Sequence, residues 1–590
     1  MKVKWSGRFE GYSFAHFKKD LLSGTIVGII AVPLAMSFAI ASGVKPEYGI
    51  YTAIIVGILI SLLGGSKFQI GGPTGAFVPI LLGVVLVYGY ENLLIAGLMA
   101  GVMLLLMGIF RLGSLIKFIP RPVTVGFTAG IAVIIFTGQI GNFLGLTNME
   151  QHEKFHMNVL EIASNIETVN FYSLLVAIIS FALILMAPKV LPKVPGALIG
   201  IIVSSFVTVL FLQGHVATIG STYGAIPNTL PQFHIPEITF ERIYMLIGPA
   251  FVIAMLGGIE SLLSAVVADG MTNSKHNSNR ELIGQGVANI VTPFFGGIPA
   301  TGAIARTATN IKSGAVSPMS GVIHGIFVLV TLLLLAPLAV HIPLASLAPV
   351  LMMVAWNMSE RHHFAHILKL KSGDSLVLCI TFLLTVFMSL TVAVMAGLIL
   401  AVILFAKSMG DSLTVSKVLP NLDRENGKLQ PQIVSDFHDC PQISIYTIEG
   451  PLFFGAAEKF EQTMLKTIQE RPKVFILRMR KVPYIDSTGE EYFRNILQNI
   501  NSYGGKVFVT NVQPGLEQML KRSGLYDLME AEHFYNTTSD AISAACQYIE
   551  VNNCIGCTHY AFKECQLLAN GIPLSEHEVQ AQNKLTEATI

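Results

Sequence analysis

Long apolar stretches, separated by short polar segments, make up most of the chain before Lys407. A helix that crosses a bilayer needs about 20 mainly apolar residues. By this rule the sequence predicts a polytopic α-helical membrane protein. Its fourteen predicted spans, two of them short, lie near residues 21–43, 48–64, 74–89, 91–111, 122–141, 171–188, 195–213, 243–266, 281–295, 301–311, 318–340, 344–357, 374–390 and 391–408.

Both short spans follow an interruption rich in Gly and Pro, at residues 71–75 and 296–302. Seven spans separate the two copies, and this odd number means that the second copy enters the membrane inverted. Broken helices at matching positions of inverted halves are typical of secondary transporters. The sequence therefore predicts a repeat of seven plus seven spans.

Each short span would begin inside the membrane, where its first N–H groups and the positive end of its dipole face a cavity. Two such helix starts that face each other can bind an anion without a cationic side chain. Arg306, one turn into the second short span, adds positive charge or forms an internal ion pair with Glu260. The alternative is a pair of ordinary Gly/Pro kinks, but their matching positions favour an anion site.

Glu260 lies inside the eighth predicted span, beside Ser264. A carboxyl group at membrane depth is costly and is therefore a functional candidate. We predict that Glu260, with Ser264, binds a coupling ion, either H⁺ or Na⁺. The alternative is a structural carboxyl group that is hydrogen-bonded to a neighbouring helix.

Loop charges indicate the orientation of the chain in the cell membrane. With both termini in the cytoplasm, the cytoplasmic loops carry twelve Lys and Arg residues and the opposite loops carry three, Lys45, Lys154 and Arg242. An excess of Lys and Arg marks the cytoplasmic side. Residues 1–20 mix Lys and Arg with aromatic side chains, which predicts a cytoplasmic or interfacial segment before a transmembrane domain at 21–412.

After residue 440 the pattern changes to alternating strands and helices, which predicts a small α/β domain at 441–550, joined through a linker at 413–440. One loop of this domain, at 484–489, leads into a helix. Asp486 or Ser487 caps that helix, or a phosphate on Ser487 forms a regulatory site there. Capping is the favoured interpretation.

The remaining segment, 551–590, contains four residues that can ligate a metal: Cys554, Cys557, His559 and Cys565. A CxxC pair with a further Cys and a His could hold zinc. Cytosolic CxxC pairs are often free thiols, and the spacing to Cys565 fits no strong template. A zinc site is therefore the less favoured interpretation.

Composition narrows the class of protein further. Hydrophobic residues make up 52% of the chain and charged residues only 13%, about half of the roughly 25% found in globular proteins. The net charge of +1 argues against a nucleic-acid partner. With no nucleophile–base arrangement and no P-loop in the sequence, an enzyme is the least favoured class. We expect no cofactor apart from a coupling ion.

Several motifs in the same order resemble the SulP (sulfate permease) family of anion transporters, along nearly the whole chain. The resemblance is carried by residues 33–39, 72–75, 260–263, 268–269 and 305–310. The soluble part resembles a STAS domain, with residues 486–489 at that domain's characteristic loop.

This resemblance implies a core domain and a gate domain, a cytoplasmic STAS domain with a possible cytoplasmic partner, and a homodimer. It also implies secondary active transport of small inorganic anions. The anion is expected between the starts of spans three and ten, and the candidate substrate-binding residues are Phe38, Thr74, Gly75, Ala76, Thr301, Gly302, Ala303 and Arg306.

Two departures from the family pattern bear on the substrate. Leu34 stands where many relatives have Gln, and Ala305 where relatives often have Ser, so the pocket depends more on backbone donors. Leu34 also resembles the bicarbonate-transporting branch, whose sodium site includes an Asp that matches Glu260. Sulfate coupled to protons through Glu260 is slightly favoured. Proton- or sodium-coupled transport of bicarbonate, or of a dicarboxylate, is the alternative.

Two other classes fit the sequence less well. A nucleobase transporter on the same inverted-repeat fold is disfavoured by the STAS-like tail and by Arg306. A sensor that is merely anchored in the membrane would have no need for paired broken helices.

Overall fold

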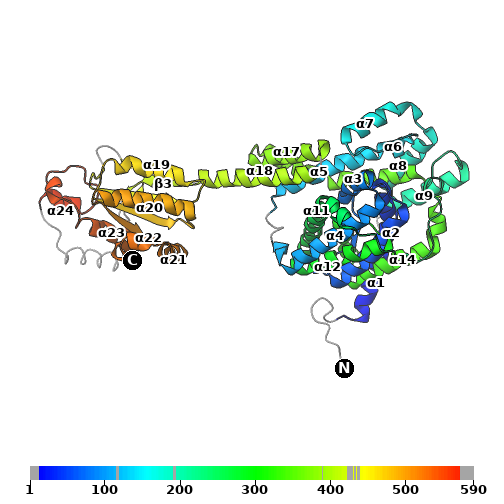
Figure 1. The fold of residues 1–590 in the computed structure, drawn as a ribbon, viewed down its shortest axis with the longest axis horizontal. Coiled ribbons are helices and arrows are strands. Elements are labelled where there is room, and N and C mark those ends of the chain that lie inside the picture. The colour runs from blue at the N-terminus through cyan, green and yellow to red at the C-terminus, as the bar shows by residue number, and fades with distance from the viewer. Residues whose placement is uncertain are drawn as a thin grey trace, which may run out of the picture. The chain divides into compact units, whose positions relative to one another are not determined.

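The computed structural model describes residues 12–114, 119–190, 194–388, 390–420, 429–430, 434 and 439–571. They form two compact units, Met1–Ala401 and Val402–Ile590. Figure 1 labels their elements.

Helices make up most of the first unit. In its first half they are α1 (Phe14–Ala41), α2 (Pro46–Leu63), η1 (Gly75–Phe77), α3 (Val78–Tyr88), α4 (Tyr90–Ile109), α5 (Arg121–Gly138), α6 (Ile140–Leu144), α7 (Phe155–Ser164), η3 (Ile166–Thr168), α8 (Phe171–Val190), α9 (Gly196–Phe211) and α10 (Ile219–Tyr223). In its second half they are α11 (Phe240–Thr272), α12 (Ser278–Val291), η4 (Thr292–Phe295), α13 (Ile304–Lys312), α14 (Met319–Ala339), α15 (Leu344–Met358), α16 (Arg361–Lys369), α17 (Gly373–Phe387) and α18 (Leu390–Asp411), the last of which continues into the second unit.

Every predicted span coincides with a helix, which confirms the helical membrane fold. Within the described residues, eight helices are long and apolar enough to cross a membrane, and three shorter ones are also apolar. The other predicted spans correspond to α12, α13 and α15, which are short. Polar side chains of α12 and α13, among them Glu281, Gln285, Arg306 and Asn310, are buried inside the protein. These helices therefore place much of their polar surface in the protein interior.

The first helix begins earlier than the predicted start at residue 21. Ser13 accepts a hydrogen bond from the backbone N–H of His16, and the His16 ring accepts one from the N–H of Ser13, so the helix starts at Phe14. Of the predicted interfacial segment 1–20, residues 1–11 lie outside the described part of the chain.

The helices of this unit pack in two groups. The first contains α1 to α4 and α11 to α14, and the second contains α5, α8, α9, α15 and α17. Small residues bring helices of a group close together: a Cβ atom on Gly101 of α4 would lie 2.6 Å from the Ile290 nitrogen of α12.

Two short strands cross in the middle of the first group. β1 (Gly71–Gly72) and β2 (Thr301–Gly302) are antiparallel, with Gly71 opposite Gly302. Each strand leads into a half-helix, η1–α3 or α13. The predicted half-helices therefore start on either side of one crossing and run away from it in opposite directions.

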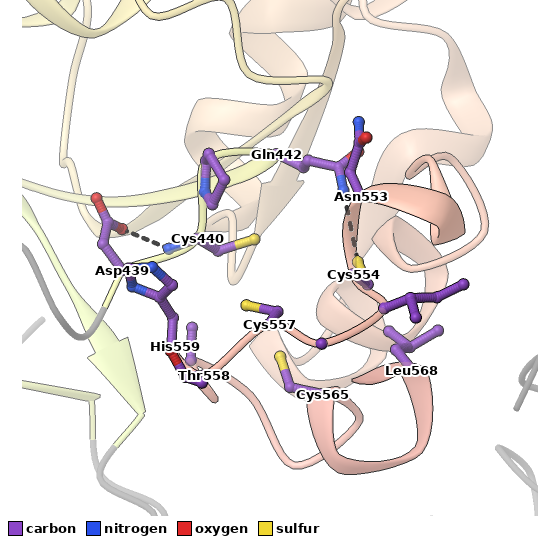
Figure 2. Close-up of a pocket in the computed structure, with 14 residues that line it drawn as sticks. Asp439, Cys440, Gln442, Asn553, Cys554, Cys557, Thr558, His559, Cys565 and Leu568 are labelled. Carbon is purple, nitrogen blue, oxygen red and sulfur yellow. Dashed lines mark hydrogen bonds between the residues drawn. The ribbon is translucent and has the colours of Figure 1, made fainter. Parts of the chain in front are cut away.

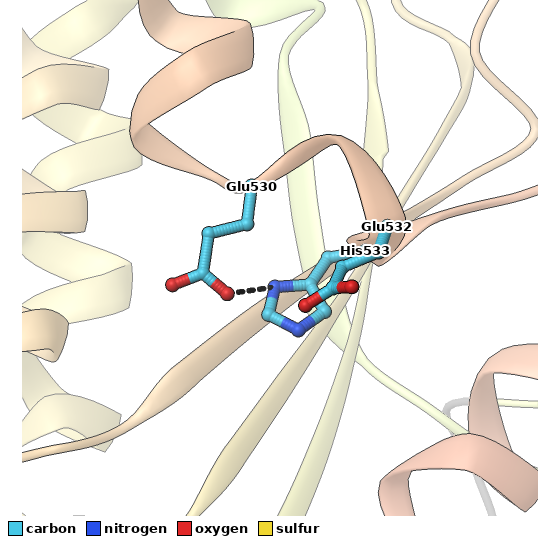
Figure 3. A group of neighbouring side chains, drawn as sticks. All are labelled: Glu530, Glu532 and His533. Carbon is cyan, nitrogen blue, oxygen red and sulfur yellow. Dashed lines mark ion pairs between the residues drawn. The ribbon is translucent and has the colours of Figure 1, made fainter.

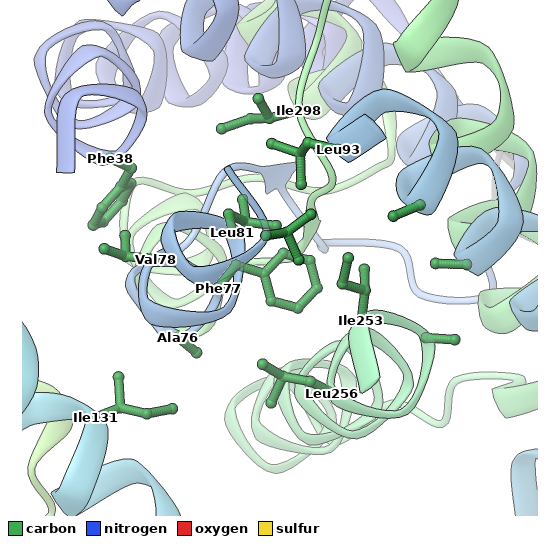
Figure 4. Close-up of a cluster of buried hydrophobic side chains, with 14 of the residues drawn as sticks. Phe38, Ala76, Phe77, Val78, Leu81, Leu93, Ile131, Ile253, Leu256 and Ile298 are labelled. Atoms are coloured by element: carbon green, nitrogen blue, oxygen red, sulfur yellow. The ribbon is translucent and has the colours of Figure 1, made fainter. Parts of the chain in front are cut away.

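Apolar side chains from both halves of the chain hold the half-helix α3 in place. Figure 4 shows Phe77 and Leu81 between Ile253 and Leu256 of α11 and Leu93 of α4. Phe77 and Leu81 are each 1% exposed. Burying a large apolar side chain stabilises the fold by roughly 1.5–3 kcal/mol, so the start of α3 is firmly fixed.

The second unit is an α/β domain, as the sequence predicts. Its five-stranded sheet has the order β3 (Thr414–Lys417), β6 (Ile443–Glu449), β7 (Val474–Lys481), β8 (Lys506–Thr510), β9 (Phe534–Tyr535), and a separate pair is formed by β4 (Leu419–Pro420) and β5 (Leu429–Gln430). β3 is antiparallel to β6, and the other neighbours in the sheet are parallel. The helices are α19 (Ala457–Ile468), α20 (Ser487–Ser502), α21 (Pro514–Arg522), α22 (Leu525–Leu528), η6 (Ala531–His533), α23 (Thr538–Ala545), η7 (Val551–Asn553) and α24 (Cys565–Ala569).

This domain extends beyond the predicted limits of 441–550 on both sides. β3 lies in the predicted linker 413–440, where its backbone groups pair with β6. In the predicted tail 551–590, Phe562 and Leu568 are each 2% exposed and pack in one cluster with Ile443 and Val474 of the sheet. Residues 572–590 lie outside the described part.

Candidate functional site

The crossing of β1 and β2 is tightly packed around Gly302. A Cβ atom on Gly302 would overlap the Gln69 side-chain amide and lie 2.5 Å from its Cδ. Gln69 is fixed because its Nε2 donates to the Ser261 carbonyl oxygen at 3.1 Å. The strand pairing continues where the Ala303 N–H donates to the Ile70 carbonyl oxygen at 2.8 Å. Any side chain at position 302 would therefore have to displace the Gln69 amide from this hydrogen bond.

Both half-helices begin without a side-chain cap. Thr74 precedes η1 and Ala303 precedes α13, and neither side chain accepts a hydrogen bond from the helix that follows. The first N–H groups of a helix have no partner inside the helix and carry partial positive charge. Two uncapped starts at one crossing are therefore suited to binding an anion.

Arg306 adds a full positive charge at this point. Its side chain is 3% exposed, and Nη2 donates to the Pro73 carbonyl oxygen just before η1. Nη1 has no hydrogen-bond partner among the described residues. A Cβ atom on Gly72 would lie 2.5 Å from Nη1, so the absence of a side chain there makes room for the guanidinium. A buried N–H donor is costly unless an acceptor satisfies it, so Nη1 is a candidate donor to a bound anion.

Glu260 of α11 reaches the start of the first half-helix. The Thr74 hydroxyl donates to its Oε2 at 2.9 Å, and the Glu260 side chain is partly exposed. Within the described part of the chain, no ion pair of 4.0 Å or less joins Glu260 to Arg306. The Ser264 hydroxyl instead donates to Thr307 Oγ1 at 3.2 Å. The structure therefore places Glu260 beside Thr74 and gives Ser264 a different partner.

The other predicted anion-site residues surround the crossing. Thr301 donates its hydroxyl to the Gly257 carbonyl oxygen at 2.9 Å, so its side chain is already engaged. Phe38 and Ala76 are buried in the apolar cluster beside α3. A Cβ atom on Gly75 would lie 3.4 Å from Phe38 and from Ile135 and Met358 of the second helix group. The start of α3 therefore faces that second group.

Two buried polar residues at this crossing were not predicted. Gln69 positions β2, as described above. His324 of α14 is 0% exposed, and neither ring nitrogen has a hydrogen-bond partner within 3.5 Å among the described residues. A Cβ atom on Gly57 would lie 2.8 Å from His324 Nδ1 and 3.7 Å from the Gly71 carbonyl oxygen, which places the ring close to β1. The sequence signal that could have identified His324 is a histidine within a long apolar segment.

In the second unit, the loop before α20 has the capping arrangement that the sequence favours. Asp486 accepts hydrogen bonds from the N–H groups of Gly489 at 2.7 Å and Phe454 at 3.1 Å. Ser487 is exposed in the first turn of α20. The carboxylate of Asp486 thus caps the helix and holds a neighbouring loop.

Figure 3 shows a cluster of possible metal ligands that the sequence did not suggest: Glu530, Glu532 and His533. Lys506 already pairs with Glu530 at 2.9 Å, and this bond lowers the pKa of the Glu530 carboxyl group. His533 donates from Nδ1 to the Met529 carbonyl oxygen at 3.0 Å. With these partners in place, the cluster is a weak candidate for a cation site.

The predicted zinc ligands only partly come together. Cys554, Cys557, His559 and Cys565 line one cavity of about 350 Å³, which Cys440 also borders. Within the described residues, no three of these ligand atoms lie within 4.8 Å of one another.

Comparison with known proteins identifies the family. The model of the sulfate permease family matches residues 17–381, and the STAS domain model matches residues 436–541. The chain belongs to the sulfate permease family. It is therefore a multi-pass membrane transporter of small anions with a C-terminal STAS domain, and not an enzyme.

Relatives in this family differ in the anion named for them. A protein of Bacillus subtilis (strain 168) named "Putative sulfate transporter YvdB" is 53% identical over 534 residues, covering 90% of this chain and 99% of the relative. "Bicarbonate transporter BicA" of Picosynechococcus sp. is 27% identical over 550 residues, covering 90% and 95%.

Solved structures of relatives agree with the fold. The structure of SLC26A9 has a TM-score of 0.81 at 18% identity and covers 92% of each chain. The transmembrane domain of a cyanobacterial bicarbonate transporter BicA has a TM-score of 0.55 at 28% identity, over 66% of this chain and 98% of that one.

Proposed function

We propose that this sulfate permease family member is a proton-coupled sulfate transporter that binds sulfate between the starts of α3 and α13. The observation that carries the proposal is the buried Arg306, whose Nη1 has no hydrogen-bond partner among the described residues and lies beside two uncapped helix starts. An anion at this crossing would accept hydrogen bonds from Nη1 and from the free backbone N–H groups.

The charges around the crossing support a doubly charged substrate. Each helix start is equivalent to about half a positive charge. Together with Arg306 they provide about two positive charges when Glu260 is protonated, and about one when Glu260 is ionised. A neutral Glu260 therefore matches a sulfate dianion. A negatively charged Glu260 would repel sulfate, so sulfate and a proton favour each other's binding.

The same charges define the alternative substrate. Bicarbonate carries a single charge and is matched when Glu260 is ionised, so its binding would require no proton at this site. The existence of a relative named as a bicarbonate transporter supports this alternative. A sodium ion on Glu260 would have the same effect on the charge as a proton. A dicarboxylate is a dianion like sulfate, and it is the remaining alternative.

Transport assays distinguish these possibilities. The purified full-length protein in liposomes would be tested for uptake of labelled sulfate under imposed proton and sodium gradients, with unlabelled bicarbonate or a dicarboxylate as competitor. We expect an inward proton gradient, and not a sodium gradient, to drive sulfate accumulation. Uptake driven by sodium alone, or sulfate uptake that bicarbonate suppresses at equal concentration, would contradict the proposal.

The variant Glu260→Gln tests the role of the carboxyl group, because the amide mimics its protonated form. Glu260→Gln should still bind sulfate and exchange it across the membrane, but a proton gradient should no longer drive net uptake. Glu241→Gln is the matched control, since Glu241 is exposed at the other end of α11. Gradient-driven accumulation by Glu260→Gln equal to that of the wild type would exclude Glu260 as the proton carrier.

We also propose that the protein lies in the cell membrane as a homodimer, with both termini and the STAS domain in the cytoplasm. The excess of Lys and Arg in the loops assigned to the cytoplasm supports this orientation. Protease added outside intact cells should leave the STAS domain uncut. Cleavage within 439–571 under those conditions would place the STAS domain outside the cell and would contradict the proposed orientation.

A further inference from the structure

Four cysteines from two distant parts of the chain meet in the second unit. Cys440 precedes β6, whereas Cys554, Cys557 and Cys565 follow the last strand of the sheet. All four line the same cavity of about 350 Å³. In Figure 2 their sulfur atoms surround one hollow, and His559 stands to the side near Asp439.

The surrounding fold holds these cysteines in place. Ala561 and Phe562 lie between Cys557 and Cys565, are 1% and 2% exposed, and pack in one cluster with the sheet residue Ile443. Gln442 donates from its side chain to the Glu550 carbonyl oxygen at 3.2 Å and accepts from the Glu550 N–H at 2.8 Å. The segment with three cysteines is therefore fastened to the strand beside Cys440.

The sulfur atoms receive hydrogen bonds from N–H donors of the kind that surround metal-bound thiolates. The Phe562 N–H donates to Cys565 Sγ at 3.4 Å, and the Gln442 amide donates to Cys554 Sγ at 3.5 Å. Such hydrogen bonds to sulfur tune metal–thiolate centres.

The four cysteines are free thiols and are not joined in disulfides. Metal ligation requires the thiolate form, and a bound metal centre would stabilise all four thiolates together.

We propose that Cys440, Cys554, Cys557 and Cys565 ligate an iron–sulfur cluster in the STAS-containing unit. Four cysteine thiolates are the ligand set of such clusters. Around a single tetrahedral zinc ion with Zn–S bonds of about 2.3 Å, all sulfur atoms lie about 3.8 Å apart. No three of the described cysteine sulfur atoms come within 4.8 Å of one another, and they surround a hollow instead. This wider arrangement suits a cluster of several iron and sulfide ions.

The proposal changes the ligand set expected from the sequence. Cys440, which borders the same cavity, replaces His559 in the proposed ligand set. A cluster at this position would join the segment before β6 to the segment after α23. It would thereby tie the sheet to residues 551–571.

The test uses the full-length protein, purified without oxygen and treated with ferrous iron, sulfide and a thiol reductant. We expect iron and acid-labile sulfide in equal amounts on each chain, broad visible absorbance, and an electron paramagnetic resonance signal in one of its two redox states. Cys440→Ser and Cys557→Ser should each lose most of the iron and the absorbance. His559→Ala, and Cys379→Ser in α17 of the membrane unit, should retain both.

Three outcomes would overturn the proposal. They are zinc in place of iron with no sulfide, disulfides among these cysteines in the anaerobic protein, and iron content unchanged in Cys440→Ser. Misfolding of the serine variants would be recognised by loss of monodispersity or of sulfate uptake. The parallel measurement on the wild type, iron and sulfide per chain, depends on no variant.

Discussion

Gly302→Ala is expected to weaken anion binding, although Gly302 itself contacts its neighbours only through its backbone. The added methyl group would overlap the Gln69 amide and lie 2.5 Å from Gln69 Cδ, whereas Cβ atoms essentially never approach other atoms within 3.0 Å. Either Gln69 gives up its hydrogen bond to Ser261, or β2 moves away from β1 and shifts the start of α13.

Both responses raise the free energy of the folded protein by a similar amount. A lost buried hydrogen bond that leaves its partner unsatisfied costs about 1–3 kcal/mol, and overpacking a close contact costs about the same. If the start of α13 moves to relieve this strain, sulfate can bind only when the strained arrangement is restored. The affinity for sulfate should then fall by roughly 5- to 150-fold. Equilibrium binding of labelled sulfate to the purified protein measures this effect.

Two further variants separate steric overlap from general damage. Gly83→Ala in α3 meets no atom within 4 Å, so its sulfate affinity should equal that of the wild type. Gln69→Ala removes the obstacle, so the double variant Gln69→Ala/Gly302→Ala should bind sulfate better than Gly302→Ala alone. Wild-type affinity in Gly302→Ala, from protein that remains monodisperse, would refute the reasoning.

Two other predictions concern capping and anchoring carboxylates. Asp486→Ala removes the cap of α20, which is worth about 1 kcal/mol, so the amide of Gly489 should exchange its hydrogen roughly fivefold faster in the full-length protein; an unchanged rate would show that the cap is dispensable. Asp20 of α1 accepts hydrogen bonds from the N–H groups of Val316 at 2.8 Å and Ser317 at 3.2 Å and from the Ser317 hydroxyl at 2.6 Å, so Asp20→Ala leaves three donors without this acceptor, at about 1–3 kcal/mol for each that stays unsatisfied. The membrane unit should then unfold at a lower temperature, and an equal Tm would contradict this role.

Hydropathy was sufficient to predict the long membrane helices because each of these carries its own signal in consecutive residues. The half-helices were also predictable, since Gly and Pro interrupt the apolar pattern just before them. In contrast, α7 and α16 were not predicted, since they are short and lack a long apolar run.

The details of the site depend on contacts between distant parts of the chain, and the sequence does not reveal them. Arg306 and Glu260 were recognisable as charges within apolar segments. The pairing of β1 with β2 and the place of Gln69 beside Gly302 depend on residues far apart in the sequence. Cys440 was overlooked for the same reason, because the fold alone brings it to the other cysteines.

Arg306 provides the most direct test of the proposed anion site. The measurement is equilibrium binding of labelled sulfate to purified wild type, Arg306→Ala and the control Lys312→Ala, whose residue is exposed at the other end of α13. A hydrogen bond from a charged group is worth about 1.5–3 kcal/mol, so Arg306→Ala should bind sulfate roughly 10- to 150-fold more weakly. Some binding should remain, because the backbone N–H groups of both helix starts are still present, and Lys312→Ala should match the wild type. Equal sulfate affinity in Arg306→Ala and the wild type would contradict the proposal that the anion binds at this crossing.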